Sequence, residues 1–223
     1  MKIFDTHVHI FPDKLKGKVL PKLAEVCHSP YYSDGTFGDT VEKLGAAGCS
    51  GFLCLHIATN PKQQDNVNAF ALEIQEQNEN IYCFGSVHPD NPNAVDMLHK
   101  LKAAGIKGVK LHPDYQDFMV DDERLKPIYA ACEELGLIVA FHAGRDPYSP
   151  DVVHNPPEKL AKIAEKYPKL IRRKGADRIL FATDFPWSTV EAERKFLESL
   201  GLTEDELELI YYKNAFRLLD IEE

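Results

Sequence analysis

Short apolar runs alternate with longer amphipathic stretches along most of the chain. Short uncharged runs are typical of buried strands, whereas apolar positions three and four residues apart predict helices. The predicted strands are Phe4–Ile10, Gly51–Ile57, Ile81–Val87, Ile106–Leu111, Leu137–Phe141 and Arg178–Ala182. The predicted helices are Lys18–Cys27, Asp39–Ala47, Asn60–Gln77, Asn93–Ala104, Asp121–Leu135, Pro156–Tyr167, Thr189–Leu200 and Glu204–Leu219. This alternation predicts a parallel sheet covered by helices.

Glycines stand at the ends of several predicted helices, directly before a predicted strand. Gly48, Gly105 and Gly136 are examples. Glycine adopts the left-handed backbone that ends many helices, so these positions support the predicted boundaries. A parallel sheet built in this way is either an open doubly wound sheet or a β/α barrel.

Metal-competent side chains follow the C-terminal ends of the predicted strands. In a β/α barrel these ends meet at one mouth, where active sites lie, whereas an open sheet would spread them along a line. No Gly-x-Gly-x-x-Gly motif follows the first strand, which disfavours a nucleotide-binding sheet. The pattern therefore predicts a barrel. The residues at the strand ends are His7, His9, His56, His88, His112, His142 and Asp184.

Four of these side chains form a predicted metal site. His7 and His9 are two residues apart on one strand, so they share a face, and Asp5 lies on the same face as a supporting group. With His142 and Asp184 they supply three nitrogens and one carboxylate. Such a set suits one divalent ion, Zn²⁺ first, and also Mn, Fe or Ni. A bound ion would activate a water molecule, and Asp184 would take the proton from that water.

Four further residues are candidate substrate contacts. Lys110 and His112 share one face of a predicted strand. Arg145 follows His142 by three residues, and its guanidinium would bind a carboxylate. Trp187 would form an aromatic wall of the pocket. These residues favour a substrate that carries an acid group.

Three motifs resemble the amidohydrolase superfamily. They are Asp5-Thr6-His7-Val8-His9, Phe141-His142-Ala143-Gly144 and Ala182-Thr183-Asp184-Phe185-Pro186-Trp187, in the family's order and across nearly the whole chain. The most similar branch is that of metal-dependent hydrolases resembling aminocarboxymuconate semialdehyde decarboxylase. The resemblance implies an α/β fold, a distorted TIM (β/α)8 barrel with one metal ion. It also implies that His7, His9, His142 and Asp184 are the ligands from strands one, five and eight.

The chain departs from the family pattern near residues 170–171. The resemblance implies strands six and seven here, with a catalytic histidine at the end of strand six. Instead, Tyr167-Pro168-Lys169-Leu170 runs directly into Ile171-Arg172-Arg173-Lys174-Gly175. Either the sequence omits a segment, or the barrel is genuinely shorter. We favour the omission, because a six-stranded remnant would expose apolar strand edges.

Residues 1–223 are expected to form a single amidohydrolase-like barrel domain. Residues 12–40 hold several prolines and glycines and form a predicted lid-like insertion directly after the His-x-His strand. Ordered insertions of this length often act as lids or substrate walls. The insertion and the other loops would therefore decide the substrate.

Composition excludes several classes of function. The chain of 223 residues has a formal net charge of -9, which disfavours nucleic acid and anionic membrane surfaces as partners. Its five scattered cysteines predict reduced thiols and a cytoplasmic protein rather than a disulfide framework. We expect no signal peptide and no membrane span. The sequence does not distinguish a monomer from a homodimer.

The expected function is a metal-dependent hydrolase of a small-molecule amide, ester or lactone, which metal-activated water would attack. The resemblance implies an alternative with the same ligands, the non-oxidative decarboxylation of an unsaturated or aromatic acid. A second alternative is a degenerate barrel without catalysis.

Overall fold

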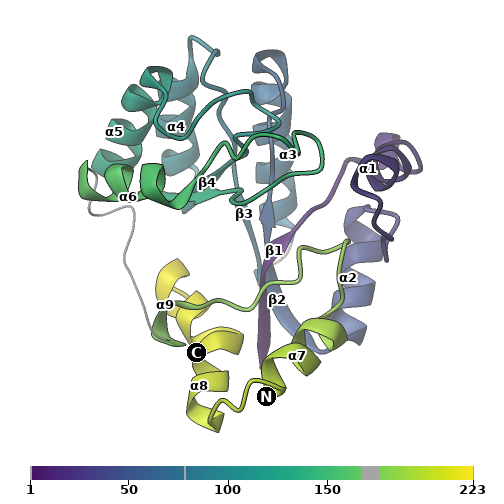
Figure 1. Ribbon diagram of the computed structural model, residues 1–223. Helices are drawn as coiled ribbons and strands as arrows, with labels where there is room; N and C mark the ends of the chain where they lie inside the picture. Colours follow the sequence, from purple (N-terminus) through teal and green to yellow (C-terminus); the bar gives the residue numbers. More distant parts are fainter. Residues whose placement is uncertain (1, 78, 167–175, 223) are drawn as a thin grey trace. The chain divides into compact units, whose positions relative to one another are not determined.

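The computed structural model of the protein describes residues 2–77, 79–166 and 176–222 (Figure 1). These residues fall into two compact units. The first holds residues 2–54, 77, 79–82 and 176–222, and the second holds residues 55–76 and 83–166. The junction predicted at Leu170–Ile171 lies outside the described residues. A single barrel domain over 1–223 stays a prediction.

The centre of the first unit is a pair of parallel strands, β1 (Ile3–Val8) and β2 (Cys49–Leu55), with Val8 opposite Cys54. Residues 181–185 run along β1 in the same direction and form a parallel bridge from Val8 to Phe185. Thr6 N donates to Phe181 O at 3.0 Å, and Phe185 N donates to His7 O at 3.1 Å. Two segments from opposite ends of the chain are thus held in register.

Helices surround these segments in the first unit. Thr36, Thr189 and Thr203 cap three of them, because each threonine side chain accepts a backbone N–H of the first turn. The predicted helix Glu204–Leu219 and its cap at Thr203 are confirmed, and its middle turn, Leu209–Lys213, is π-helical. The helices are η1 (Asp13–Leu15), α1 (Val19–Cys27), α2 (Phe37–Ala46), η4 (Ala176–Arg178), α7 (Val190–Glu198), α8 (Glu204–Glu208), η5 (Leu209–Lys213) and α9 (Asn214–Leu219).

The insertion at residues 12–40 is an ordered part of the first unit. Lys16 forms an ion pair with Asp34, and Phe11 N donates to Gly35 O at 2.8 Å. Tyr32 N donates to Pro186 O at 2.9 Å. The insertion is therefore tied to the loop that follows Asp184, and its action as a lid stays a prediction.

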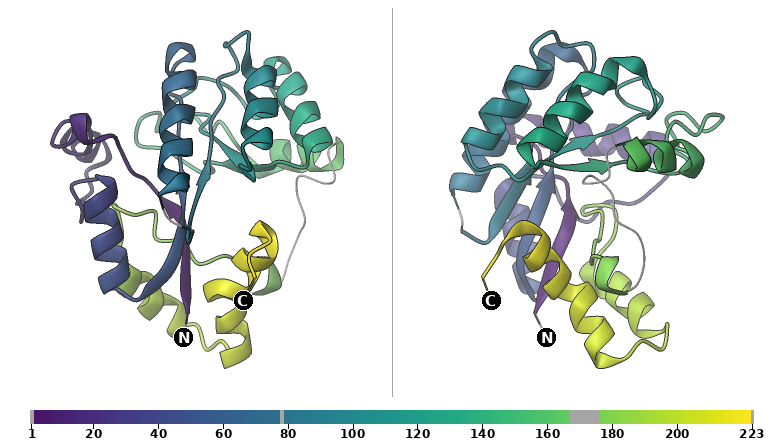
Figure 2. Two further views of the ribbon diagram at one scale, coloured as in Figure 1. Left: turned by 180° about the vertical axis from the view of Figure 1, so that it is seen from behind. Right: turned by 90° about the vertical axis from the view of Figure 1, so that its left-hand side faces the viewer.

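The second unit contains the end of β3 (Ile81–Phe84) and two parallel strands, β4 (Gly108–Leu111) and β5 (Ile138–Phe141). A parallel bridge from Gly85 to Val109 continues the pairing on the other side of β4. Figures 1 and 2 show α4 and α5 side by side on one side of these strands. The helices of this unit are η2 (Pro61–Gln63), α3 (Gln64–Glu76), α4 (Ala94–Ala103), η3 (Glu123–Leu125), α5 (Lys126–Leu135) and α6 (Pro157–Lys166).

Glycine at position 108 lets neighbouring strands approach closely. A Cβ atom on Gly108 would lie 2.5 Å from Ile138 O and 2.7 Å from the Phe84 ring. In the core of this unit α4 packs against α5, and β4 packs against β5. The fully buried apolar residues include Leu98, Leu101, Val109, Leu111 and Cys132.

The predicted strand Arg178–Ala182 is wrong. Arg178 ends a 3-10 helix, and the segment that follows bonds to β1 on one edge only. On its other side, Phe181 N donates to Ile210 O at 2.9 Å, in a helical turn rather than a strand. The described residues therefore contain five strands, one fewer than the six predicted.

Candidate metal centre

Three predicted ligands of the first unit meet at one point. His7 lies in β1 and His9 directly follows the last residue of that strand, Val8, whereas Asp184 lies in the segment 181–185 that is paired with β1. Asp184 Oδ1 lies 3.2 Å from His7 Nε2 and 3.1 Å from His9 Nε2. The two Nε2 atoms are 3.1 Å apart. The structure therefore brings three donor atoms into a compact triangle.

The triangle fits a divalent metal ion. Donors bound at about 2.0–2.2 Å around one ion are spaced by about 3–3.5 Å, which is the spacing seen here. Asp184 has a left-handed backbone with a φ of 54°, a conformation uncommon outside glycine and typical of functional positions. Its side chain is 53% exposed, so a small molecule can reach this carboxylate.

Asp5 is hydrogen-bonded to both of the segments that carry the three donor residues. Its buried carboxylate accepts the backbone N–H groups of His7 and Thr183, each at 3.1 Å, and the hydroxyl of Thr183. Burial raises the pKa of Asp5 to about 7, against the opposing effect of these hydrogen bonds. The predicted supporting role of Asp5 therefore takes a specific form, a link between the two segments that carry the ligands.

His142, the fourth predicted ligand, belongs to the second unit. There its Nε2 atom lies 3.4 Å from Asp146 Oδ2, and His112 Nε2 lies 3.7 Å from the same oxygen. The His142 and His112 rings are stacked with their centroids 4.2 Å apart, and the Tyr115 ring stacks on His112 with a centroid distance of 3.8 Å. The ligation of a shared ion by His142 stays a prediction.

The stack of Tyr115, His112 and His142 does not itself form a chelating site. An imidazole binds a metal ion in the plane of its ring, and two rings inclined by only 11° have planes that do not meet nearby. The stack and Asp146 instead fix the orientation of His142 from two directions. Orientation of a ligand ring by its neighbours is a general property of metal sites.

A group of Ser149, Asp114 and His154 also lies in the second unit. Both the Ser149 hydroxyl and His154 Nδ1 contact Asp114 Oδ1, the latter at 2.9 Å. A nucleophilic triad needs the serine and the carboxylate on opposite ring nitrogens. Here Ser149 Oγ lies 3.5 Å from Nδ1, the nitrogen that faces Asp114. This group therefore fastens the loop after β5 and lacks the geometry of a triad.

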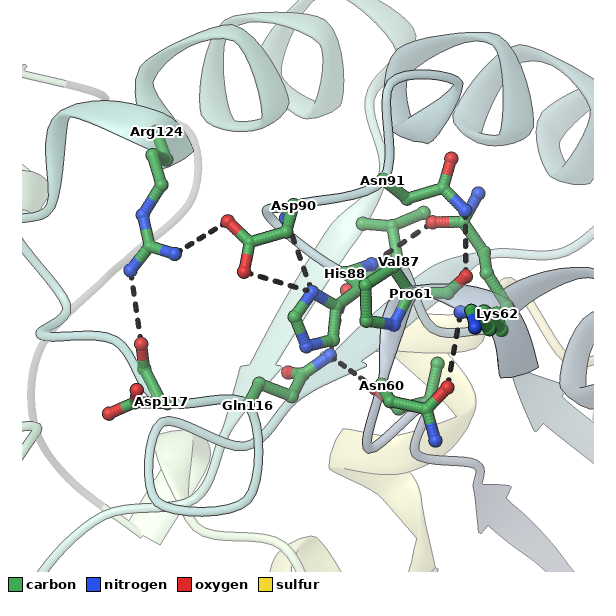
Figure 3. A network of polar contacts seen from close by, with 12 residues as sticks. Asn60, Pro61, Lys62, Val87, His88, Asp90, Asn91, Gln116, Asp117 and Arg124 are labelled. Atoms are coloured by element: carbon green, nitrogen blue, oxygen red, sulfur yellow. Dashed lines mark hydrogen bonds and ion pairs between the residues drawn. The ribbon is translucent and has the colours of Figure 1, made fainter.

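Side chains join the loops that follow the strands of the second unit (Figure 3). Gln116 Nε2 donates to Ala58 O at 3.0 Å and to Val87 O at 2.9 Å. Arg124 Nη1 lies 2.6 Å from Asp90 Oδ1. These contacts join the loops to one another. We call this group of residues the rim: Ala58, Val87, Asp90, Gln116 and Arg124.

Within the rim, the backbone N–H of Asp90 donates to His88 Nδ1 at 3.1 Å. Burial lowers the pKa of His88, which keeps the ring neutral and Nδ1 an acceptor. His88 is thus part of the scaffold of the rim rather than a candidate ligand.

The predicted substrate residues are divided between the units. Lys110 and His112 are buried at the end of β4, and Arg145 is exposed in the loop after β5. Trp187 is in the first unit, where its backbone N–H donates to Asp184 O at 2.9 Å. The structure thus places Lys110, His112 and Arg145 in one unit and Trp187 beside the metal triangle in the other.

Sequence reasoning missed Thr183, Asp146 and Tyr115. Thr183 directly precedes a predicted ligand, and its hydroxyl could have been matched to Asp5. Asp146 follows His142 by four residues in a Gly- and Pro-containing loop, where the sequence alone does not fix side-chain directions. Tyr115 carries no signal beyond its position in the loop after His112.

Two predictions from composition can be compared with the described residues. Cys54 and Cys83 are buried, as expected of thiols that pack like small apolar side chains, and none of the five cysteines, all in the described part of the chain, forms a disulfide. No helix in the described part of the chain has the length and apolar character of a membrane span.

Comparisons with known proteins connect these features to a family. The Amidohydrolase family model matches residues 4–172 and 160–221. A search of curated proteins gives no match. Among solved structures, an uncharacterised TIM-barrel protein from Bordetella bronchiseptica superposes with a TM-score of 0.79 at 19% identity, covering 99% of each chain.

Two similar structures are decarboxylases. The 5-carboxyvanillate decarboxylase of Sphingomonas paucimobilis gives a TM-score of 0.72 at 13% identity over 99% of each chain. A dihydroxybenzoic acid decarboxylase from Polaromonas, with bound manganese and the inhibitor 2-nitroresorcinol, gives 0.69 at 12% identity over 99% of this chain and 97% of that one. These likenesses support an α/β fold of the TIM-barrel kind.

Proposed function

The chain belongs to the amidohydrolase family of enzymes, and we propose that it catalyses the metal-dependent, non-oxidative decarboxylation of a small unsaturated or aromatic acid. The observation that carries this proposal is the triangle of His7, His9 and Asp184, whose donor atoms lie within 3.2 Å of one another. These residues would hold one divalent ion, with His142 as a fourth ligand. Zn²⁺ and Mn²⁺ are the first candidates for this ion.

Two considerations favour decarboxylation over hydrolysis. The similar solved structures include decarboxylases of aromatic acids, one of them with bound manganese. The second unit also carries Lys110 and Arg145, and cationic groups of this kind suit an acid substrate.

The chemistry assigns a distinct role to Asp184. A bound ion would hold an anionic oxygen of the substrate and withdraw charge from it. The partly exposed carboxyl of Asp184 would deliver a proton to the substrate carbon that bears the carboxylate. The bond from that carbon to the carboxylate then breaks, its electron pair returns to the unsaturated system, and carbon dioxide leaves.

Hydrolysis of an amide, ester or lactone is the second candidate. The exposure of Asp184 favours it, because water can reach the carboxylate that would accept its proton. The same three ligands serve both reactions, so the site geometry alone does not separate them.

An assay of the full chain separates the two reactions. Chelated protein is reloaded with Zn²⁺ or Mn²⁺ and given hydroxybenzoic and unsaturated carboxylic acids, and released carbon dioxide is measured. Lactone hydrolysis is followed in parallel by proton release, and amide hydrolysis by the amine or ammonia that it releases. We expect metal-dependent carbon dioxide release that is lost in Asp184→Asn. The control variant Asp205→Asn should keep it, because Asp205 is an exposed carboxylate of the same unit. Turnover of lactones or amides alone would favour the hydrolase.

A further inference from the structure

We infer that Thr183 is a positioning residue of the metal centre, because its hydroxyl and the Asp5 carboxylate hold Asp184 in register with His7 and His9. The inference rests on the proposed function, since it concerns the same site. Thr183 is not one of the three donor residues, and yet it would set the distances between their donor atoms. We call Asp5 and Thr183 the clasp.

The clasp joins the two segments at the level of the ligands. Asp5 Oδ1 accepts the N–H of His7, on one segment, and the N–H of Thr183, on the other. Asp5 Oδ2 accepts the Thr183 hydroxyl. One carboxylate therefore fixes the backbone beside His7 and the backbone beside Asp184 at once.

The Thr183 hydroxyl also fixes the chain beyond Asp184. Its oxygen accepts the N–H of Phe185 at 3.0 Å while its proton goes to Asp5. Phe185 in turn pairs with β1 through a parallel bridge to Val8, and His9 N, just after that strand, donates to Phe185 O at 2.7 Å. The residues on both sides of Asp184 are thus anchored, and Asp184 itself takes the left-handed turn between them.

The clasp is buried, so its hydrogen bonds cannot be replaced by bonds to water. Asp5 is 0% exposed and Thr183 is 2% exposed. Water is not available to replace a lost donor, so removal of the Thr183 hydroxyl leaves the register of Asp184 dependent on the remaining backbone bonds. Outer partners of metal ligands typically change metal affinity by about 10–100-fold when they are removed.

The same two segments provide a matched control. The Thr6 hydroxyl donates to Phe181 O at 2.8 Å and is also buried. It joins β1 to the same opposing segment, but from the other face of the strand, away from His7 and His9. Thr6→Val and Thr183→Val therefore remove one buried hydroxyl each from the same pair of segments.

The test uses the full chain and cobalt(II), whose visible absorption reports the number and geometry of its ligands. We expect Thr183→Val to bind cobalt about 10–100-fold more weakly, with an altered spectrum, and Thr183→Ser to restore both. Thr6→Val should lower the thermal unfolding midpoint and leave the cobalt affinity and spectrum unchanged. Should Thr183→Val not fold, Asp5→Asn provides the comparison, because its amide Oδ1 can still accept both backbone N–H groups.

Two results would overturn the inference. One is a Thr183→Val protein with the wild-type cobalt spectrum and affinity. The other is an equal change of the spectrum in Thr6→Val and Thr183→Val, which would show a general structural effect. Wild-type protein that binds no cobalt would instead contradict the proposed function, and so the two failures can be told apart.

Discussion

His9 Nε2 lies 3.1 Å from Asp184 Oδ1, although the two residues come from opposite ends of the chain. The pairing of β1 with residues 181–185 creates this proximity, and it places His7 in the same group. A site made in this way depends on both histidines, since each supplies one of three donors.

The His7→Ala/His9→Ala double variant should therefore lose divalent metal binding. We expect the affinity for Zn²⁺ or Mn²⁺ to fall by more than about 100-fold, beyond the effect of losing an outer partner. Titration calorimetry and metal analysis of the purified protein measure this. His99→Ala, at an exposed histidine on α4, should bind as the wild type does. Undiminished binding by the double variant would refute the assignment.

The ion pair of Lys16 and Asp34 should make the stability of the insertion depend on pH. The hydrogen bond from Lys16 holds the pKa of Asp34 at about 2, below its ordinary value. A carboxyl with a lowered pKa stabilises the fold above its unfolded pKa of about 3.9 and loses this effect as the pH falls through its folded value. Asp34→Asn should thus cost at most about 1 kcal/mol at neutral pH, and the difference should vanish between about pH 4 and pH 2.

Thermal unfolding at a series of pH values measures this difference. Lys16→Gln removes the same ion pair and should reproduce the loss at neutral pH. A constant difference between wild type and Asp34→Asn from pH 7 to pH 2 would contradict the prediction.

Substitution of Gly108 should destabilise the second unit. The new Cβ would meet Ile138 O at 2.5 Å, a contact with backbone that cannot move aside. Gly108→Ala should cost about 1–3 kcal/mol in denaturant unfolding, as overpacking does. Gly45 lies in α2 with open space around it. Gly45→Ala should instead stabilise the protein by about 0.5–1 kcal/mol. Equal effects of the two variants would contradict the packing seen at β4.

Ser149 should not act as a nucleophile. Its hydroxyl donates to Asp114 Oδ1 and lies near His154 Nδ1, the same nitrogen that contacts Asp114, so these three residues lack the arrangement in which an imidazole takes the serine proton for attack. A fluorophosphonate probe should leave the protein unlabelled, and Ser149→Ala should retain the metal-dependent activity. Labelling that disappears in Ser149→Ala would show a nucleophile that the geometry does not predict.

The sequence predicted that His7, His9 and Asp184 lie together better than it predicted the elements around them, and their role as metal ligands stays a prediction. The period of two in a strand places His7 and His9 on one face, and the order of the motifs assigns Asp184 to a neighbouring segment. The strand Arg178–Ala182 was wrong, because Phe181 N bonds to Ile210 O, a partner that no local pattern reveals. Local signals also gave no indication of the π-helical turn at Leu209–Lys213.

The surroundings of His142 illustrate the same limit. Its position after β5 follows from the pattern of apolar residues, but its neighbours depend on the path of a loop. Asp146 and Tyr115 reach the rings of His142 and His112 through that path. Side-chain directions in such loops are set by tertiary contacts, so no spacing rule predicts them.

We propose above that His7, His9 and Asp184 bind one divalent ion. The most direct test is a crystal of the full chain grown or soaked with Mn²⁺, with diffraction recorded on both sides of the manganese absorption edge. We expect one anomalous peak within about 2.0–2.3 Å of His7 Nε2, His9 Nε2 and a carboxylate oxygen of Asp184. An absent peak, or one bound by other residues while these three side chains remain in direct contact, would contradict it.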